Sequence, residues 1–169
     1  TCHDSDGVVF NNCTAIYDST THPLPAKGTQ QGFEIDEGCS GCTVSNSYAR
    51  GMTCGIQIKG HTDTVSARAS VARDCVVEDV GVGIMFSVGR AGTADDRIVG
   101  NSADTIHIVS IDPAKYGGEG LAVLVYGADG VHIANLTNDS DRGIKIEQNA
   151  GIVTLRNIGF TAVCADTLV

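Results

Sequence analysis

The sequence predicts an all-β protein folded as a right-handed single-stranded parallel β-helix, a solenoid of roughly six rungs in which each rung is one turn of the chain. Three observations support this prediction. Two short motifs recur along the 169 residues and alternate with each other. Glycine is abundant, with 21 residues, whereas aromatic residues make up only 5% of the chain. No segment has the heptads of a coiled coil or the pattern of a long amphipathic helix, so many short strands with tight corners are expected.

The first motif is a glycine followed by two apolar residues with one residue between them. Such alternation places successive side chains on opposite faces of a strand. Each copy is too short to bury its apolar face alone, so the copies are expected to stack as parallel strands. The copies are Gly32–Ile35, Gly55–Ile58, Gly83–Phe86, Gly120–Val123 and Gly143–Ile146.

The second motif has two alternating apolar residues and ends on Asn or Asp. Asn tolerates the left-handed backbone conformation and hydrogen-bonds the backbone of its own turn, so a column of Asn at one corner is expected, directed inward. The third copy leaves only Val80–Val82 before the next glycine motif, too few residues for a full third strand. The copies are Val8–Asn12, Cys42–Asn46, Cys75–Asp79, Arg97–Asn101, Val131–Asn135 and Val153–Asn157.

The segments between these copies contain no amphipathic stretch of helix length, which excludes a sheet built from βαβ units. A chain of 169 residues suits one domain, so residues 1–169 are expected to form a single β-helix domain. A full rung starts at Val8 and the last residues lead toward another strand. We therefore expect the domain to be a fragment of a longer chain whose flanks supply the caps.

On these repeats, which cover nearly the whole chain, the sequence resembles the pectate-lyase-like family of right-handed parallel β-helices. This family includes polysaccharide lyases, epimerases and phage tailspikes. The resemblance implies that the glycine motifs are first strands, that the Asn motifs are second strands, and that a carbohydrate groove lies over the first-strand face. It rests on the repeat and includes no catalytic signature.

Outward positions of the stacked first strands are expected to form two columns. One column is Glu34, Gln57, Met85, Ala122 and Lys145, and the other is Asp36, Lys59, Ser87, Leu124 and Glu147. Polar groups concentrate at the first two rungs. The candidate catalytic residues are Glu34, Asp36, Lys59, His61 and Asp63, and the candidate substrate-binding residues are Gln57, Ser87, Arg90, Lys145 and Glu147.

These residues suit two reactions on a polysaccharide. Hydrolysis needs two carboxylates, about 5–5.5 Å apart in retaining enzymes and about 6.5–9.5 Å apart in inverting ones. β-Elimination needs a base near the C5 proton and a group that neutralises the uronate, roles open to Lys59, His61 and Arg90. A C5-epimerase would use the same base chemistry, and a non-catalytic carbohydrate- or receptor-binding shaft or adhesin needs only the groove. Solvated exterior residues paired across rungs explain the same pattern. No metal or cofactor is expected, except Ca²⁺ if the protein is a uronate lyase.

The net charge and the cysteine content limit which partners and which cellular locations are expected. A net charge of −9 argues against nucleic acid, and no apolar run is long enough to insert in a membrane. The seven cysteines are interpreted mainly as small, reduced, buried core residues. Free cysteines favour a virion-surface protein over a secreted enzyme. The expected location is extracellular or on a virion surface, and the expected partner is a polysaccharide.

A homotrimer would cover an apolar outward column of the second strands. That column is expected to contain Val9, Thr43, Val76, Ile98, His132 and Thr154. Glycosylation sequons occur at Asn12, Asn135 and Asn138. Two of these belong to the column expected to point inward, so their glycosylation is not expected.

Overall fold

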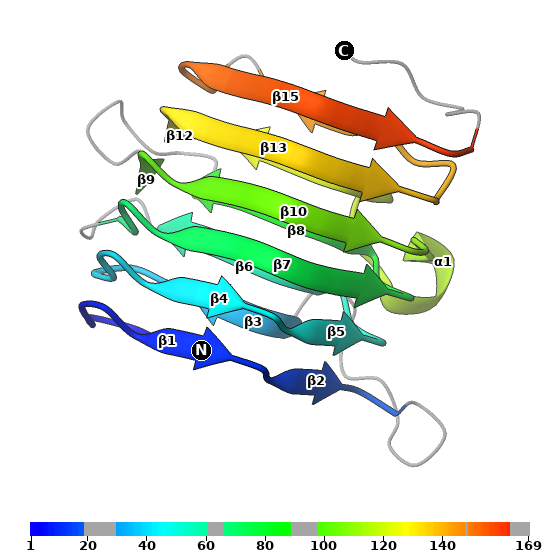
Figure 1. Cartoon of the computed structure of the whole chain (residues 1–169), viewed down its shortest axis with the longest axis horizontal. Coiled ribbons are helices and arrows are strands. Elements are labelled where there is room, and N and C mark those ends of the chain that lie inside the picture. The colour runs from blue at the N-terminus through cyan, green and yellow to red at the C-terminus, as the bar shows by residue number, and fades with distance from the viewer. Residues whose placement is uncertain (19–29, 61–65, 89–97, 148, 163–169) are drawn as a thin grey trace.

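A computed structural model describes residues 1–18, 30–60, 66–88, 98–147 and 149–162, and these residues form mainly β-strands (Figure 1). One sheet contains β1 (Val9–Asn11), β2 (Thr14–Ile16), β4 (Thr43–Ser45), β5 (Tyr48–Arg50), β7 (Val71–Glu78), β10 (Ser102–Ile108), β13 (Val131–Asn138) and β15 (Val153–Phe160). A second contains β3 (Gln31–Ile35), β6 (Cys54–Gly60), β8 (Val82–Val88), β11 (Leu121–Tyr126) and β14 (Ile144–Ile146). The pair β9 (Ile98–Val99) and β12 (Ala128–Asp129) and the short helix α1 (Pro113–Tyr116) complete the described elements.

The two large sheets lie one behind the other, and the chain alternates between them (Figure 1). Every named strand pair is parallel, and strands that neighbour each other in a sheet are separated in sequence by a visit to the other sheet. The described part of the chain has one helix, of four residues. The predicted all-β parallel architecture is therefore confirmed.

The core lies between the two sheets and is built from stacked rows of like residues. The row from the five-stranded sheet is Ile35, Ile58, Phe86 and Val125, and the facing row from the eight-stranded sheet is Val44, Ala72, Ala103 and Ile133. These side chains are almost completely buried. Each strand is too short to exclude water from its own apolar residues, so every rung depends on its neighbours for burial.

The repeated glycine of the first motif is explained by close packing inside the sheet. A Cβ on Gly55 would lie 2.3 Å from Cγ1 of Val77 and 2.8 Å from the carbonyl oxygen of Gly83. The register is correct at four of the five copies, with Phe33, Ile56, Ile84 and Ile144 in one row.

The fourth copy of the glycine motif was misaligned. Val123, and not Leu121, pairs with Ile84 and Ile144. The equivalent positions therefore move by two residues, so Leu124 and Tyr126 replace Ala122 and Leu124 in the outward columns. Gly120 instead has a φ of 69° at the end of the segment that follows α1.

A column of residues with left-handed backbone runs through the eight-stranded sheet. The strand register aligns six positions whose φ angles lie between 49° and 55°. They are Asn12, Asn46, Asp74, Thr105, Asn135 and Asn157. A left-handed residue within an extended segment interrupts its regular alternation, and here it divides the longer strands into two halves at the same level of each rung.

Two of the six predicted Asn steps lie outside this column. Cys75–Asp79 follows the column, because Val76 pairs with Tyr48 rather than with Thr43. Asp79 has the predicted left-handed backbone, with a φ of 51°, but at a separate corner. Ile98 and Val99 pair with β12 in the small sheet, and Asn101 is buried, accepting a hydrogen bond from the Ser70 amide at 2.9 Å. Asp74 and Thr105 hold the corner instead, because Asp also tolerates left-handed backbone and Thr is held there by its neighbours in the sheet.

The column also points outward rather than inward. Asn46 donates to Asn11 at 2.9 Å, Asn135 donates to Asp104 at 2.7 Å, and Asn157 donates to Asn135 at 2.9 Å, all at the exposed surface. The sequon residues Asn12 and Asn135 are therefore exposed, so the reason given against their glycosylation does not hold.

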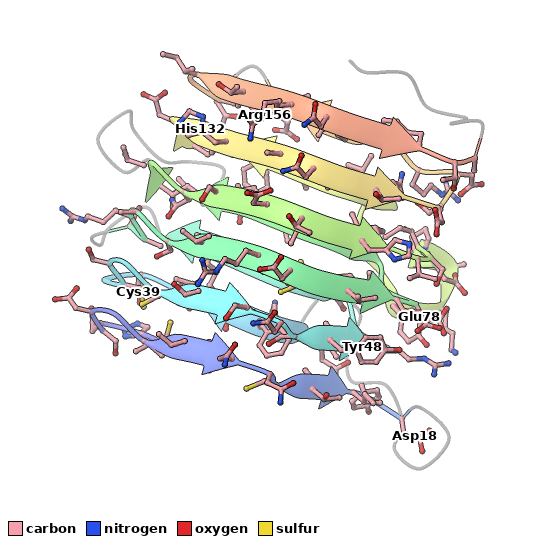
Figure 2. All side chains as sticks on the ribbon, viewed as in Figure 1. Asp18, Cys39, Tyr48, Glu78, His132 and Arg156 are labelled. Atoms are coloured by element: carbon pink, nitrogen blue, oxygen red, sulfur yellow. The ribbon has the colours of Figure 1, made fainter. Side chains whose placement is uncertain are left out.

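The exterior of the eight-stranded sheet is more polar than predicted. In the outward column that was expected to be apolar, Val71 and Ser102 replace Val76 and Ile98. Polar side chains project from this sheet, among them Tyr48, Glu78, His132 and Arg156 (Figure 2). The face that a homotrimer was expected to cover is therefore less apolar than predicted.

Thr105 is the β-branched member of the left-handed column, and replacing it should stabilise the protein. Thr105→Asn is expected to raise the free energy of unfolding by on the order of 1 kcal/mol, because Asn adopts this backbone conformation with less strain. The measurement is the urea midpoint at unchanged m-value. Thr137→Asn, on an exposed ordinary strand position of β13, is the control and should give no gain. An equal gain in both variants would contradict the assignment of strain to Thr105.

Candidate functional site

The outward face of the five-stranded sheet gathers the candidate residues, and the register extends this face by one rung. Cys2 forms a parallel bridge with Ile35, which places Thr1 beside Glu34 and His3 beside Asp36. The two outward columns are then Thr1, Glu34, Gln57, Met85, Leu124 and Lys145, and His3, Asp36, Lys59, Ser87, Tyr126 and Glu147.

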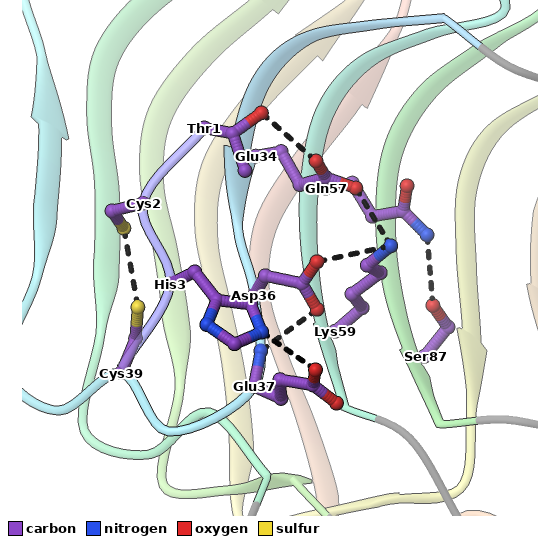
Figure 3. Close-up of polar contacts among 10 residues, drawn as sticks. All are labelled: Thr1, Cys2, His3, Glu34, Asp36, Glu37, Cys39, Gln57, Lys59 and Ser87. Atoms are coloured by element: carbon purple, nitrogen blue, oxygen red, sulfur yellow. Dashed lines mark hydrogen bonds and ion pairs between the residues drawn. The ribbon is translucent and has the colours of Figure 1, made fainter. Parts of the chain in front are cut away.

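Lys59 holds the two candidate carboxylates together (Figure 3). Its Nζ lies 2.8 Å from Oε1 of Glu34 and 3.1 Å from Oδ2 of Asp36. Glu34 also accepts a hydrogen bond from Thr1 Oγ1 at 3.0 Å, and Asp36 accepts one from the Glu37 amide at 2.7 Å. Glu34 and Asp36 are only 8% and 7% exposed, so this is a largely buried ionic cluster on the outer face of a sheet.

The environment of Lys59 keeps its amine protonated. Burial acts to lower the pKa of Lys59, but the hydrogen bonds that Lys59 donates to Glu34 and Asp36, together with the charges of these carboxylates, outweigh burial, so the pKa is raised from its ordinary value. A general base must be unprotonated at the working pH. Lys59 in this arrangement therefore suits charge neutralisation and orientation better than abstraction of a proton.

Gln57 and Ser87 continue the polar cluster onto the next rungs. Gln57 Nε2 donates to Ser87 Oγ at 3.2 Å, and both side chains are buried. Gln57 Oε1 is also buried and has no hydrogen-bond partner among the described residues. A buried amide oxygen without a donor is costly, so Gln57 Oε1 is the acceptor of this cluster that the described residues leave unsatisfied.

His3 is a member of the site that the sequence prediction missed. Its Nε2 lies 2.6 Å from Oε1 of Glu37, and its Nδ1 lies 3.0 Å from Oδ2 of Asp4. The hydrogen bond to Glu37 raises the pKa of His3 from its ordinary value. The sequence contained one signal of this placement. Cys2 stands between two polar residues, as Ile35 stands between Glu34 and Asp36, so the same alternation of buried and outward side chains could have been recognised.

A second apolar cluster spans β6, β8 and β11 of the same sheet. Cys54, Val82, Leu121 and Leu124 form this cluster, with Met85 and Tyr126 packed against it. Beyond it, Lys145 Nζ lies 3.2 Å from Oε1 of Glu147 and 3.4 Å from Oε2 of Glu119. These charged residues stand three strands from Lys59, about 14 Å away at about 4.8 Å per strand. Lys145 and Glu147 are therefore not brought together with the Glu34 cluster.

Three predicted site residues, His61, Asp63 and Arg90, lie outside the described residues. A depression of about 350 Å³ lies between β2 and β3, lined by Ala15, Ile16, Tyr17, Gln30, Gln31 and Met52. It contains none of the predicted site residues.

The described residues contain one group of three or more metal-ligating side chains, and it is made of cysteines. The sulfur atoms of Cys2, Cys39 and Cys42 all lie within 4.8 Å of one another. By contrast, the ammonium of Lys59 already lies between the carboxylates of Glu34 and Asp36, where a Ca²⁺ ion would need several oxygen ligands. The arrangement of these two carboxylates therefore does not itself support the predicted alternative of a Ca²⁺ site.

The comparisons with known proteins give no match for this chain among family models, curated proteins or solved structures. Among the described residues, no helix has the length and apolar character needed to cross a membrane.

The ion pair between His3 and Glu37 gives a pH-dependent prediction. In a ¹H–¹³C NMR titration, the His3 pKa should lie above the ordinary value of about 6.5 and should fall toward it in Glu37→Gln. Because the folded-state pKa is raised, the contribution of this pair to stability is present below about pH 6.5 and is lost as pH rises through the raised pKa. Asp4→Asn, which removes a weaker influence, should lower the pKa less. An unchanged His3 pKa in Glu37→Gln would show that the contact is absent in solution.

Proposed function

We propose that this chain is a right-handed single-stranded parallel β-helix that binds a polysaccharide along the outward face of β3, β6, β8, β11 and β14. The main observation in support is the buried polar cluster of Glu34, Asp36, Lys59, Gln57 and Ser87 on that face. Charged and amide groups on the outer face of a sheet are rarely buried, because removing them from water is costly unless another interaction compensates for it. In this proposal the Gln57 side chain rotates outward on binding, so that Oε1, which is covered in the free chain, accepts a hydrogen bond from a sugar hydroxyl.

The neighbouring strands offer apolar surface that could contact the apolar face of a sugar ring. Sugar rings present apolar C–H faces as well as hydroxyls, and Tyr126 and Met85 offer apolar surface next to Ser87 and Gln57. The Glu34–Lys59–Asp36 cluster has two negative groups and one positive group. A uronate would meet excess negative charge here, so a neutral glycan fits this part of the face better than an acidic one.

A second candidate function is hydrolysis of the bound glycan by Glu34 and Asp36. Oxygens of both carboxylates contact the same nitrogen of Lys59. The two carboxyl groups are therefore closer to the spacing of retaining glycosidases, about 5–5.5 Å, than to the wider spacing of inverting ones. One carboxyl group would protonate the leaving oxygen and the other would attack the anomeric carbon, with water completing the hydrolysis. β-Elimination or C5-epimerisation would need a base other than Lys59, whose raised pKa keeps it protonated, and the other two predicted bases, His61 and Arg90, lie outside the described residues.

The wider setting proposed from the sequence accompanies this function. The chain would be a domain of the pectate-lyase-like or phage tailspike type, acting at an extracellular or virion surface, with polysaccharide rather than nucleic acid as partner. A homotrimer belongs to the same proposal. One observation favours a non-catalytic binding shaft over an enzyme: Lys59 forms ion pairs with both candidate catalytic carboxylates, Glu34 and Asp36.

Glycan binding can be tested at Gln57. Affinity electrophoresis against neutral and acidic polysaccharides should show retardation by a neutral glycan, weakened at least tenfold by Gln57→Met because the hydrogen bond to Oε1 is lost. Gln30→Met, outside the polar cluster, is the matched control and should bind like the unchanged protein. Binding to no polysaccharide, or equal binding by both variants, would overturn the proposal for this face.

Cleavage is tested separately from binding. If Glu34 and Asp36 are catalytic, the bound glycan should release reducing ends without the near-ultraviolet absorbance of an unsaturated sugar. Glu34→Gln and Asp36→Asn should each reduce that release at least a hundredfold, while Glu119→Gln on the same face should not. If the glycan binds and no reducing ends appear, the hydrolase proposal fails and the binding proposal stands.

A further inference from the structure

The cysteines near the N-terminal end of the fold form a cluster that the proposed glycan site does not use. Cys2 comes from the segment that pairs with β3, and Cys39 and Cys42 come from the corner between β3 and β4. Their sulfur atoms lie within 4.8 Å of one another, with Cys2 and Cys39 at 3.3 Å. Cys39 and Cys42 are 0% exposed and Cys2 is 6% exposed.

The sulfur–sulfur contact of Cys2 and Cys39 sets this cluster apart from the other cysteines among the described residues. Cys13, Cys54 and Cys75 each donate to a backbone carbonyl two residues away, at 3.5, 3.2 and 3.0 Å, as isolated core thiols do. Cys39 instead donates to the sulfur of Cys2 (Figure 3). Cys42 donates to the Ser5 carbonyl at 3.4 Å and to the carbonyl of Ser40, two residues away, at 3.7 Å.

We propose that Cys2, Cys39 and Cys42 form a three-sulfur binding site for a soft monovalent metal ion, Cu(I). Thiolate sulfur is the ligand that soft ions prefer, and Cu(I) accepts three such ligands in a plane. Structural Zn²⁺ sites require four ligands, and no His, Asp or Glu of the described residues joins the three sulfurs. The ion would bind a site already assembled by the strand register and would join the first rung to the β3–β4 corner.

Binding replaces sulfur–hydrogen bonds by sulfur–metal bonds without change of oxidation state. Each thiol that becomes a ligand releases its proton to solvent, and the ion enters as Cu(I) and stays Cu(I). Burial, reinforced by the neighbouring sulfurs of Cys39 and Cys42, raises the pKa of Cys2. Binding should therefore weaken as pH falls, because protons and the ion compete for the same sulfurs.

The test is an anaerobic titration of the fully reduced chain with Cu(I) in competition with a chromogenic Cu(I) chelator. We expect one Cu(I) per chain, three sulfur ligands by X-ray absorption, and at least tenfold weaker binding in Cys39→Ala and Cys42→Ala. Cys13→Ala is the matched control and should bind as the unchanged chain does. Circular dichroism of each variant, together with the X-ray absorption of the unchanged chain, keeps the result interpretable if one variant folds poorly.

Three outcomes would overturn the proposal. One is Cu(I) binding that is equal in the cluster variants and the control. Another is one equivalent of Zn²⁺ bound by the cluster when Cu(I) is not. The third is a Cys2–Cys39 disulfide in the isolated protein whose reduced form binds no Cu(I), which would assign the close sulfurs to redox chemistry. None of these outcomes bears on glycan binding, since that site lies on the outer face of the sheet.

Discussion

Parallel pairing of strands within each sheet is the constraint on which the rest of the structure depends. Each strand pairs with a strand that the chain forms only after it has visited the other sheet. Because side chains alternate with period two, a slip of one residue would exchange buried and exposed positions along a whole strand. The inward rows headed by Ile35 and Val44 make such a slip unfavourable, since it would expose their apolar side chains to water.

The same register creates the chemistry of the outer face. Glu34 and Asp36 stand two residues apart on one strand, and Lys59 stands on the next, so one ammonium reaches both carboxylates. A buried charge is costly when alone and tolerable when paired and hydrogen-bonded, which gives this cluster a fixed geometry. The proposed glycan site and the proposed Cu(I) site therefore have a common origin, because the N-terminal segment contributes to both through the Cys2–Ile35 bridge.

The sequence predictions succeeded where the periodic pattern was unambiguous. Glu34, Gln57 and Lys145 occupy the predicted column, and Asp36 and Lys59 are in contact as expected. The sequence predictions failed where a segment that matched the motif was not the segment that pairs in the sheet. Gly120 resembles the start of a first strand, but the strand that pairs begins its repeat two residues later, because pairing is decided by the fit of Val123 between Ile84 and Ile144.

The left-handed column shows the same limit. Asp79 has left-handed backbone outside the column and Asn101 is buried, whereas Asp74 and Thr105 occupy the column, because a backbone conformation can be held by neighbouring strands against residue preference. The sequence by itself determined the all-β class, the alternation of side chains and most of the outward columns, since these depend on local periodicity. Only the tertiary structure decided that Cys2 meets Cys39 and that His3 faces Glu37. Those contacts join residues more than thirty positions apart, and their register depends on loop lengths that local periodicity does not encode.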